Sequence, residues 1–260
     1  MNLSVLFQPL DAGPLSLRSR IAMAPMTRSR APGNIPNALM REYYSQRAGA
    51  GLQITEGVAP APEGLGYARI PGLFNVAQAR AWGEIAQAVH ERGGKLVVQL
   101  MHTGRIGHEL NLPAGAGPLL APSAIAAAGQ MWTDAQGMQA HPLPKAMDAQ
   151  ELERVKGAFV RAAEFAVAAG VDGVELHAAN GYLLAQFLNP KSNQRKDAYG
   201  GSAPNRRSFV LEVVDAVAAA IGRERVGIRL SPFNPFNDLE ANYPNEEVEL
   251  LELVRELDAR

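Results

Sequence analysis

The sequence contains no cysteine among its 260 residues, and this absence excludes several kinds of chemistry at once. Disulfide bonds, thiolate zinc sites, iron–sulfur clusters and a cysteine nucleophile all require a thiol that this chain does not have. A strong charge of either sign is also missing, since the formal net charge is −1 at pH 7. We therefore expect neither nucleic acid nor an anionic membrane surface as a partner.

Long apolar stretches are absent as well. The hydrophobic runs end well before the roughly 18 residues that a membrane-spanning helix requires. The first residues, MNLSVLFQPLDAG, show no basic segment, apolar core or cleavage site of a secretory signal. What remains, 47% hydrophobic and 20% charged residues, is ordinary globular composition. We expect a soluble, cytoplasmic protein without membrane association.

Short apolar segments alternate with longer helical patterns, which is typical of a parallel α/β protein. A doubly wound nucleotide-binding sheet is disfavoured because no G-x-G-x-x-G follows the first strand and no P-loop motif occurs. We therefore predict a (β/α)8 barrel of the TIM type, whose strands are buried on both faces. The predicted strands are residues 20–25, 52–55, 95–100, 171–176 and 225–230; the predicted helices are 38–48, 76–92, 148–169, 204–221 and 244–260; a hairpin is predicted at 3–18.

These elements form five strand–helix units, whereas a closed barrel needs eight, each of ~30 residues. We predict a single TIM-barrel-type domain over residues 1–260, with five units in residues 20–260 and the barrel incomplete at its C-terminus. Such a sheet exposes the edges of its first and last strands. Pairing through these edges, or a homo-oligomer, is therefore expected.

A polar or flexible residue stands near the C-terminal end of each predicted strand, the end at which barrels build their sites. One alternative is that polarity simply resumes where a strand leaves the core. Gln99 and Arg229 argue against it, because they lie within apolar runs (VVQL and GIRL). A buried arginine requires an anionic or strongly polar partner. The pattern predicts a site at Met26-Thr27, Glu56-Gly57, Gln99, His177 and Arg229.

The segment HAANGY (177–182) adds three hydrogen-bonding side chains at the end of the fourth strand. His177 and Asn180 both carry N–H donors, and two converging donors form a receptor for a carbonyl oxygen that gains negative charge. A tyrosine such as Tyr182, with an ordinary pKa of ~10, stays protonated at neutral pH and is available as a proton donor. The alternative makes Asn180 a helix cap and Tyr182 a core aromatic.

Several segments resemble the Old Yellow Enzyme family of FMN-dependent ene-reductases. RIAMAPMTRSRA (20–31), VVQLMHTGRIGH (97–108) and VGIRLSP (226–232) resemble strand motifs of the family, and residues 173–217 are the most specific stretch. The resemblance implies FMN as cofactor and NADPH, or NADH, as reductant. It implies reduction of the activated C=C bond of α,β-unsaturated carbonyl or nitro compounds, with hydride transfer through flavin N5.

The same resemblance implies roles for individual residues. Residues 24–27, at the end of the first strand, would line the flavin ring. Gly57 would let the backbone approach the ring closely. Gln99 and Arg229 would bind its pyrimidine edge. The residues implied to bind FMN are Ala24, Pro25, Met26, Thr27, Gly57, Gln99 and Arg229. His177 and Asn180 would hold the substrate oxygen, and Tyr182 would protonate the α-carbon. Tyr67 and Met101 would line the substrate pocket.

Two features depart from the family pattern. Met101 stands where many bacterial relatives have tryptophan, and a smaller, more flexible side chain predicts a roomier pocket with altered facial selectivity. The family's FMN phosphate site lies beyond the fifth helix, and the chain has no counterpart of it. The alternative hypothesis is therefore a truncated, flavin-free fragment or assembly partner without activity of its own.

Other candidate sites are weaker. A barrel lyase would need a Schiff-base lysine at a strand end, and none is present there. His102 and His108 are six residues apart in a glycine-containing loop, a poor spacing for a metal pair, so we predict no metal. Arg206 and Arg207 are interpreted as structural or solvated residues, and the acidic run NEEVELLELVREL (245–257) as the solvent face of a helix.

Overall fold

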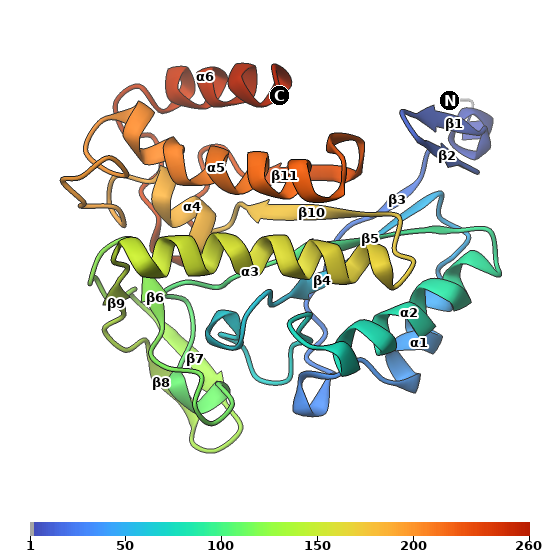
Figure 1. Ribbon diagram of the computed structural model, residues 1–260, viewed down its shortest axis with the longest axis horizontal. Helices are drawn as coiled ribbons and strands as arrows, with labels where there is room; N and C mark the ends of the chain where they lie inside the picture. Colours follow the sequence, from blue (N-terminus) through green and yellow to red (C-terminus); the bar gives the residue numbers. More distant parts are fainter. Residues whose placement is uncertain (1–2) are drawn as a thin grey trace.

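The computed structural model describes residues 3–260 and has a five-stranded parallel sheet at its centre (Figure 1). The strands pair in the order β11-β10-β5-β4-β3, so each lies beside the next strand along the chain. A doubly wound sheet would reverse its order at a switch point, whereas a barrel winds in one direction. This topology therefore corresponds to part of a (β/α)8 barrel. The strands are β3 (Ala22–Met23), β4 (Leu52–Val58), β5 (Lys95–Leu100), β10 (Gly173–Ala178) and β11 (Val226–Leu230).

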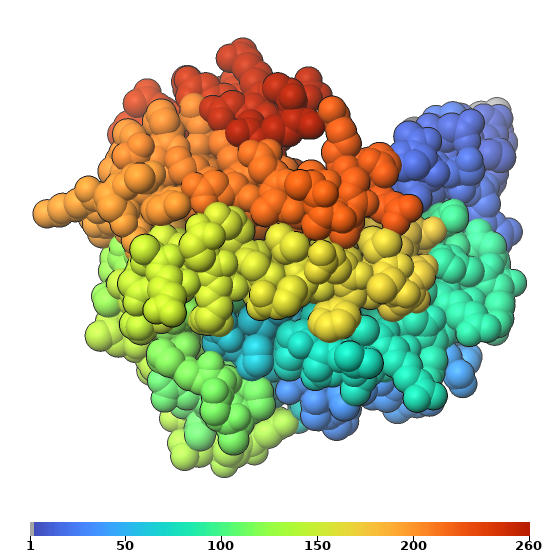
Figure 2. Space-filling view, in the orientation of Figure 1, coloured from blue at the N-terminus to red at the C-terminus, as the bar shows by residue number. Residues whose placement is uncertain are grey.

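The helices cover one side of this sheet, with α3 and α5 crossing it side by side (Figures 1 and 2). Right-handed crossovers between neighbouring parallel strands place consecutive helices on the same face. Helix α6 lies beside α5, above it in Figure 1, and its residues Glu246 and Leu250 line a small cavity with Leu230 of β11. No helix within residues 3–260 is both long and apolar enough to cross a membrane. The helices are α1 (Ala38–Ser45), α2 (Val76–His90), α3 (Ala149–Ala168), α4 (Leu183–Leu188), α5 (Ala203–Ile221) and α6 (Glu246–Asp258).

Local sequence signals set the ends of the long helix α3, which fixes where β10 begins. Asp148 and Glu151 form a capping box: the carboxylate of Asp148 accepts the Glu151 N–H at 2.9 Å, and that of Glu151 accepts the Asp148 N–H at 3.0 Å. A cap of this kind contributes about 1 kcal/mol. Gly170 follows the helix with a φ of 88°, a left-handed conformation that suits glycine. The chain then turns directly into the sheet.

The main hydrophobic core lies between the sheet and these helices. Leu96, Val98 and Leu100 of β5 point into it and are fully buried. Trp82, from α2, and Phe159, from α3, fill the space above them and are inaccessible to solvent. Truncating an aromatic side chain at such a position typically costs about 3–5 kcal/mol. The helix-facing side of the sheet is therefore a packed layer, and the site must lie elsewhere.

The observed elements correct the predicted boundaries in several places. β3 pairs with β4 only at Ala22 and Met23, so the first strand is much shorter than predicted. β4 runs three residues further than predicted, through a bulge between Ile54 and Gly57. His177 lies inside β10 and not beyond it. The predicted N-terminal hairpin is present as the antiparallel strands β1 (Leu10–Ala12) and β2 (Leu15–Leu17).

The long segment between β5 and α3 contains two small strand pairs. An antiparallel hairpin projects at the lower left of Figure 1, and a short parallel pair brings together the residues that precede and follow this hairpin. These strands are β6 (Leu120–Ala121), β7 (Gln130–Thr133), β8 (Gly137–Ala140) and β9 (Lys145–Ala146). Short 3-10 helices lie at Leu3–Phe7, Pro32–Asn34, Pro62–Gly64, Glu109–Asn111, Arg223–Arg225 and Phe236–Asp238.

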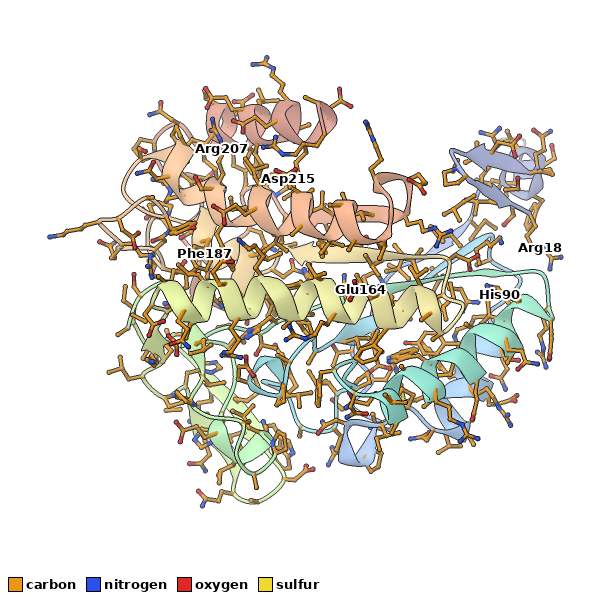
Figure 3. All side chains as sticks on the ribbon, viewed as in Figure 1. Arg18, His90, Glu164, Phe187, Arg207 and Asp215 are labelled. Atoms are coloured by element: carbon orange, nitrogen blue, oxygen red, sulfur yellow. The ribbon has the colours of Figure 1, made fainter. Side chains whose placement is uncertain are left out.

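The interpretation of the acidic run in α6 was wrong in part. Glu249 and Glu252 face α5, where they form ion pairs with Arg206 and Arg207 respectively. Arg207, labelled in Figure 3, lies between the two helices. Of the structural and solvated roles considered for these arginines, the structural one is observed. The most exposed apolar side chains of α6 point the other way: Val248, Leu251 and Val254.

Candidate functional site

A cavity of about 160 Å³ opens at the C-terminal ends of the five parallel strands. Its position is the face at which barrels bind their ligands. The lining contains the sequence-predicted site residues except Tyr67 and Glu56. The residues that line it are Ala24, Pro25, Met26, Thr27, Gly57, Gln99, Met101, His177, Asn180, Tyr182 and Arg229.

Strand register explains why these side chains meet. Residues paired across neighbouring strands point to the same face of a sheet, as do residues two apart on one strand. Gln99 pairs with Glu175, and His177 pairs with Arg229, so these four side chains form two adjacent rows. Gly57 pairs with Gln99 on its other side. The row of paired residues that contains Gln99 therefore carries the polar side chains of Gln99 and Glu175 and has no side chain at Gly57.

His177 supplies one N–H donor to the cavity. Its side chain is buried, and its Nδ1 accepts the backbone N–H of Ala179 at 3.3 Å, which leaves the proton on Nε2. Burial, with a smaller contribution from the nearby positive charge of Arg229, lowers the pKa of His177 to about 3. The imidazole is therefore neutral at ordinary pH. It donates a hydrogen bond through Nε2 without adding charge.

Asn180 supplies a second donor from a constrained loop. Its φ of 55° lies in the left-handed region, which asparagine tolerates better than most residues. Its side-chain Oδ1 accepts from Nδ2 of Asn234 at 2.8 Å, so its NH2 group is the part left for a ligand. The alternative of a helix cap was wrong: the residue at the N-cap of α4 is Tyr182, and no side chain caps that helix.

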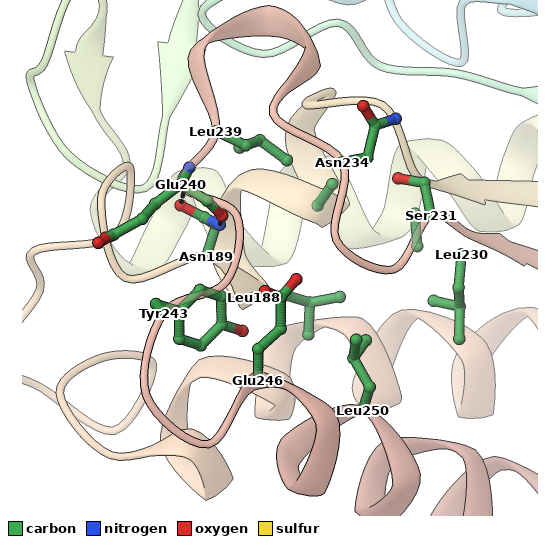
Figure 4. A pocket seen from close by; sticks show the side chains of 12 residues that line it. Leu188, Asn189, Leu230, Ser231, Asn234, Leu239, Glu240, Tyr243, Glu246 and Leu250 are labelled. Carbon is green, nitrogen blue, oxygen red and sulfur yellow. Dashed lines mark hydrogen bonds between the residues drawn. The ribbon is translucent and has the colours of Figure 1, made fainter.

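The loop that follows β11 holds Asn180 in place, and sequence reasoning missed it. The hydroxyl of Ser231 accepts the Asn180 N–H at 2.8 Å, and Nδ2 of Asn237 donates to the Asn180 carbonyl at 2.7 Å. Figure 4 shows Ser231 and Asn234 on this loop, beside a smaller cavity. Further along, the Glu240 carbonyl accepts from the side chain of Asn189 at 2.8 Å. Hydrogen bonds thus hold the loop at several points around the donor pair, His177 and Asn180.

Tyr182 and Tyr67 form a hydroxyl pair at the edge of the cavity. Their hydroxyl oxygens are 3.0 Å apart, and the ring of His177 packs edge-on against Tyr182 with a centroid distance of 4.9 Å. Burial raises the pKa of both tyrosines, and the neighbouring Tyr67 raises that of Tyr182 further. Tyr182 therefore remains a protonated phenol over the whole working pH range.

Glu175, which contacts two of the residues that line the cavity, was also not identified by sequence reasoning. The predicted requirement of Arg229 for an anionic partner is met inside the chain, because Nε of Arg229 donates to Oε1 of Glu175 at 2.9 Å. Nε2 of Gln99 donates to the same oxygen at 2.7 Å. The signal for it was present: Glu175 stands two residues before His177 within one strand, so both side chains share a face.

Met101 closes the cavity beside Gly57. It is fully buried, and a Cβ added at Gly57 would collide with the sulfur and terminal methyl of Met101. A side chain at position 57 would therefore require the flexible end of Met101 to move. Because both residues line the cavity, the size of the side chain at position 101 controls how much space a ligand finds there.

The two histidines considered for metal binding serve local structure. Nδ1 of the buried His102 accepts the Gly104 N–H at 3.1 Å, and Nδ1 of His108 accepts the Leu110 N–H at 3.2 Å. Burial lowers the pKa of His102 to about 4. Across the part of the chain that the structure describes, no group of three or more histidine, aspartate or glutamate side chains is arranged to hold a metal ion.

The cavity combines an apolar wall, made by the residues after β3 with Gly57, and polar groups on the opposite strands. Gln99 and Arg229 offer hydrogen bonds to a polar ring edge, whereas His177, Asn180 and Tyr182 offer donors to a second molecule. A flat heteroaromatic cofactor fits this distribution. The fold and the site together define a barrel protein of the TIM type with a ligand site at its strand ends.

The chain belongs to the NADH:flavin oxidoreductase / NADH oxidase family, whose family model matches residues 5–258. Within that family it is a member of the Old Yellow Enzyme group. A curated relative described as a probable flavin mononucleotide-dependent alkene reductase, from Leishmania infantum, is 42% identical over 242 residues, which cover 91% of this chain and 66% of the relative. The chain spans between 58% and 66% of the length of three such relatives.

Solved structures confirm the predicted fold class. Morphinone reductase in complex with tetrahydroNAD superposes with a TM-score of 0.90 and 43% identity, covering 97% of this chain and 71% of that one. An Old Yellow Enzyme homologue from Zymomonas mobilis gives a TM-score of 0.91 and 38% identity, covering 97% of this chain and 71% of that one. The five-stranded sheet is thus part of a (β/α)8 barrel.

Proposed function

We propose that this chain binds FMN in the strand-end cavity and reduces the activated C=C bond of α,β-unsaturated carbonyl or nitro compounds with a nicotinamide as reductant. The observation that carries the proposal is the convergence of His177, Asn180 and Tyr182 on a cavity whose other polar groups are Gln99 and Arg229. The names of the relatives, which include alkene reductases and 12-oxophytodienoate reductases, support the same reaction class.

The residues opposite the donor pair would hold the cofactor. The backbone from Ala24 to Thr27 and the bare backbone of Gly57 offer a surface against which a flat ring system packs. Gln99 and Arg229 would hydrogen-bond the pyrimidine edge of the ring. Bound FMN supplies a carrier that takes hydride from the nicotinamide and gives it to the alkene.

The donor pair would activate the substrate. Nε2–H of His177 and the NH2 group of Asn180 bind the carbonyl or nitro oxygen, which gains negative charge as hydride adds to the β-carbon. Both donors are fixed before the ligand arrives, His177 by Ala179 and Asn180 by Asn234. Little reorganisation is therefore needed when the charge develops.

Tyr182 would complete the reaction by giving its proton to the α-carbon. The new C–H bond forms as the electron pair returns from the polarised oxygen, and the product is a neutral saturated compound. The hydroxyl of Tyr67, 3.0 Å away, is placed to return a proton to Tyr182. A phenol with a raised pKa is a weak acid, so the proton moves only after negative charge has built up on the substrate.

The identity of the reductant, the domain organisation, the location and the oligomeric state of the protein are also part of the proposal. NADPH is proposed as the preferred nicotinamide, with NADH as the alternative, and it would visit the same cavity as the alkene. The complex of morphinone reductase with tetrahydroNAD supports a nicotinamide site in a related barrel. A single domain over residues 1–260, a cytoplasmic location and a homo-oligomer are proposed on the same footing.

The proposal is tested by anaerobic oxidation of NADPH with 2-cyclohexenone as acceptor, after incubation of the purified chain with FMN. We expect an enone-dependent rate that falls at least about 100-fold in His177→Ala and in Asn180→Ala, since each removes one donor to the developing charge. His108→Ala is the matched control, because that histidine lies outside the cavity. Absence of any enone-dependent rate in the wild-type chain, or equal rates in all variants, would overturn the proposal.

A further inference from the structure

Glu175 occupies the centre of the polar row beneath the cavity. It lies on β10, between Gln99 on β5 and Arg229 on β11, and its side chain is largely buried. Oε1 accepts two hydrogen bonds, from Gln99 at 2.7 Å and from Arg229 at 2.9 Å, and Oε2 accepts a third from Nη2 of Arg229 at 3.3 Å. One carboxylate therefore holds both side chains that face the cofactor side of the cavity.

The first consequence concerns the orientation of Gln99. A glutamine amide has a donating and an accepting end, and without a fixed partner either end can face a ligand. In this chain Nε2 is turned toward Glu175, which can only accept when it is ionised. The carbonyl oxygen of Gln99 is then the end left for the cavity. The site is thereby set to receive an N–H group from a ring edge.

The second consequence concerns the charge of Arg229. Two of its nitrogens, Nε and Nη2, are bonded to Glu175, and the ion pair offsets the positive potential that the guanidinium projects into the cavity. The side chain of Arg229 is 34% exposed, whereas that of Glu175 is 12% exposed. The carboxylate is thus the more buried partner, and its field is less screened by water.

We propose that Glu175 is a positioning residue that orients Gln99 and Arg229 toward the pyrimidine edge of FMN and moderates the charge of Arg229. This inference rests on the proposed function, because it assumes that FMN occupies the cavity. Reduction of the flavin adds negative charge to its pyrimidine part, which Arg229 favours and Glu175 opposes. The chain would therefore use this carboxylate to lower the two-electron reduction potential of the bound flavin.

The alternative is that Glu175 is only a structural ion-pair partner in the sheet. Glu63 provides the matched comparison, since it too is a buried glutamate paired with an arginine, Arg154, and it does not line the cavity. Replacing either glutamate by glutamine keeps the size of the side chain and removes one negative charge. A structural role predicts the same kind of effect at both positions, a loss of stability without a change in the flavin.

The test is the midpoint potential of the FMN-loaded protein, measured by anaerobic equilibration with a reference dye. For Glu175→Gln we expect about a tenfold stronger preference for reduced over oxidised flavin than in the wild type, a shift of about +30 mV for two electrons. For Glu63→Gln we expect the wild-type potential. A flavin-loaded Glu175→Gln protein with an unchanged potential, or an equal shift in Glu63→Gln, would overturn the inference and leave the proposed function intact.

A second variant keeps the inference testable if Glu175→Gln does not fold. Glu175→Asp retains the charge, but its shorter side chain does not reach both neighbours, so we expect the dissociation constant of FMN to rise at least about fivefold. An unchanged constant would contradict the positioning role. If the wild-type chain binds no FMN at all, the proposed function fails, and this inference fails with it.

Discussion

The hydroxyl oxygen of Tyr182 lies 3.0 Å from that of Tyr67, although the two residues come from different strand–helix loops. Tyr67 follows β4, and Tyr182 immediately precedes α4. The side chain of Asn237, from the loop after β11, lies near both hydroxyls. Three loops therefore meet at the proposed proton donor, and its orientation depends on all of them.

Removing the hydroxyl of Tyr182 should slow the protonation step. Since a positioned general acid contributes about 10²–10⁴-fold, we expect Tyr182→Phe to lower the rate at which 2-cyclohexenone reoxidises the reduced protein by a factor in this range. Tyr67→Phe removes only the partner hydroxyl, and a smaller loss, about tenfold, is expected. Stopped-flow absorbance of the flavin gives both rates. A wild-type rate in Tyr182→Phe would show that the proton comes from elsewhere.

Substrate binding should not depend on the protonation of His177 at ordinary pH. Because its pKa is lowered to about 3, the imidazole is neutral from roughly pH 4.5 upward. We expect the dissociation constant of 2-cyclohexenone, measured by calorimetry on the FMN-loaded protein, to stay constant between pH 5 and pH 8. His177→Ala should weaken binding about tenfold at every pH in this interval. A transition near the ordinary histidine pKa, present in the wild type and lost in the variant, would contradict the assignment.

Glu56 makes a prediction about stability and pH. It is buried beneath Tyr44, which donates to it at 3.3 Å, and burial raises its pKa to about 6 from an ordinary value of 4.5. The folded state therefore holds a proton more tightly than the unfolded state. Its contribution to stability is full below pH 4.5 and is lost as the pH rises through 6.

Glu56→Gln should accordingly be more stable than the wild type at pH 8 but not at pH 4. We expect the difference in unfolding free energy to change by about 2 kcal/mol between these conditions, since one pKa unit corresponds to about 1.4 kcal/mol. Urea denaturation at both pH values measures it. Glu84→Gln, at a mostly exposed position on α2, is the control and should show little change. An equal effect of Glu56→Gln at both pH values would refute the explanation.

Met101 provides a prediction about selectivity. Its side chain fills the space next to Gly57 and forms part of the cavity wall. Met101→Trp places a larger, rigid ring there, so a prochiral enone should bind with its other face toward the flavin, or bind more weakly. Chiral chromatography of the product from a 2-substituted enone measures the outcome. Identical product stereochemistry in the two proteins would show that position 101 does not control facial selectivity.

Periodicity alone was sufficient for the sheet and for most of the candidate site. The strands β5 and β11 are apolar runs with one polar interruption each, and those interruptions, Gln99 and Arg229, line the cavity as predicted. Their convergence follows from parallel strands in consecutive order, which puts equivalent ends at one edge. The specific roles of these residues went beyond periodicity and came from the family resemblance.

Features that depend on long-range contacts were not predictable in the same way. In the sequence, Glu175 is a single polar residue in an apolar segment. Only the pairing of β10 with β5, which places Glu175 beside Gln99, shows what its side chain contacts. Asn237 lies 57 residues from Asn180, so no local pattern links the two. The bulge in β4 places Gly57 opposite Gln99 through an irregular pairing that the segment LQITEGV does not reveal.

The proposed function requires that Gln99 and Arg229 hold FMN in the strand-end cavity. Titration of FMN fluorescence with the purified chain measures this binding. We predict saturable binding of one FMN per chain, weakened at least about tenfold in Gln99→Leu and in Arg229→Gln and retained in His177→Ala and Tyr182→Phe, whose side chains are assigned to the substrate. Absence of binding by the wild-type chain, or equal binding by all four variants, would show that these two residues do not hold FMN.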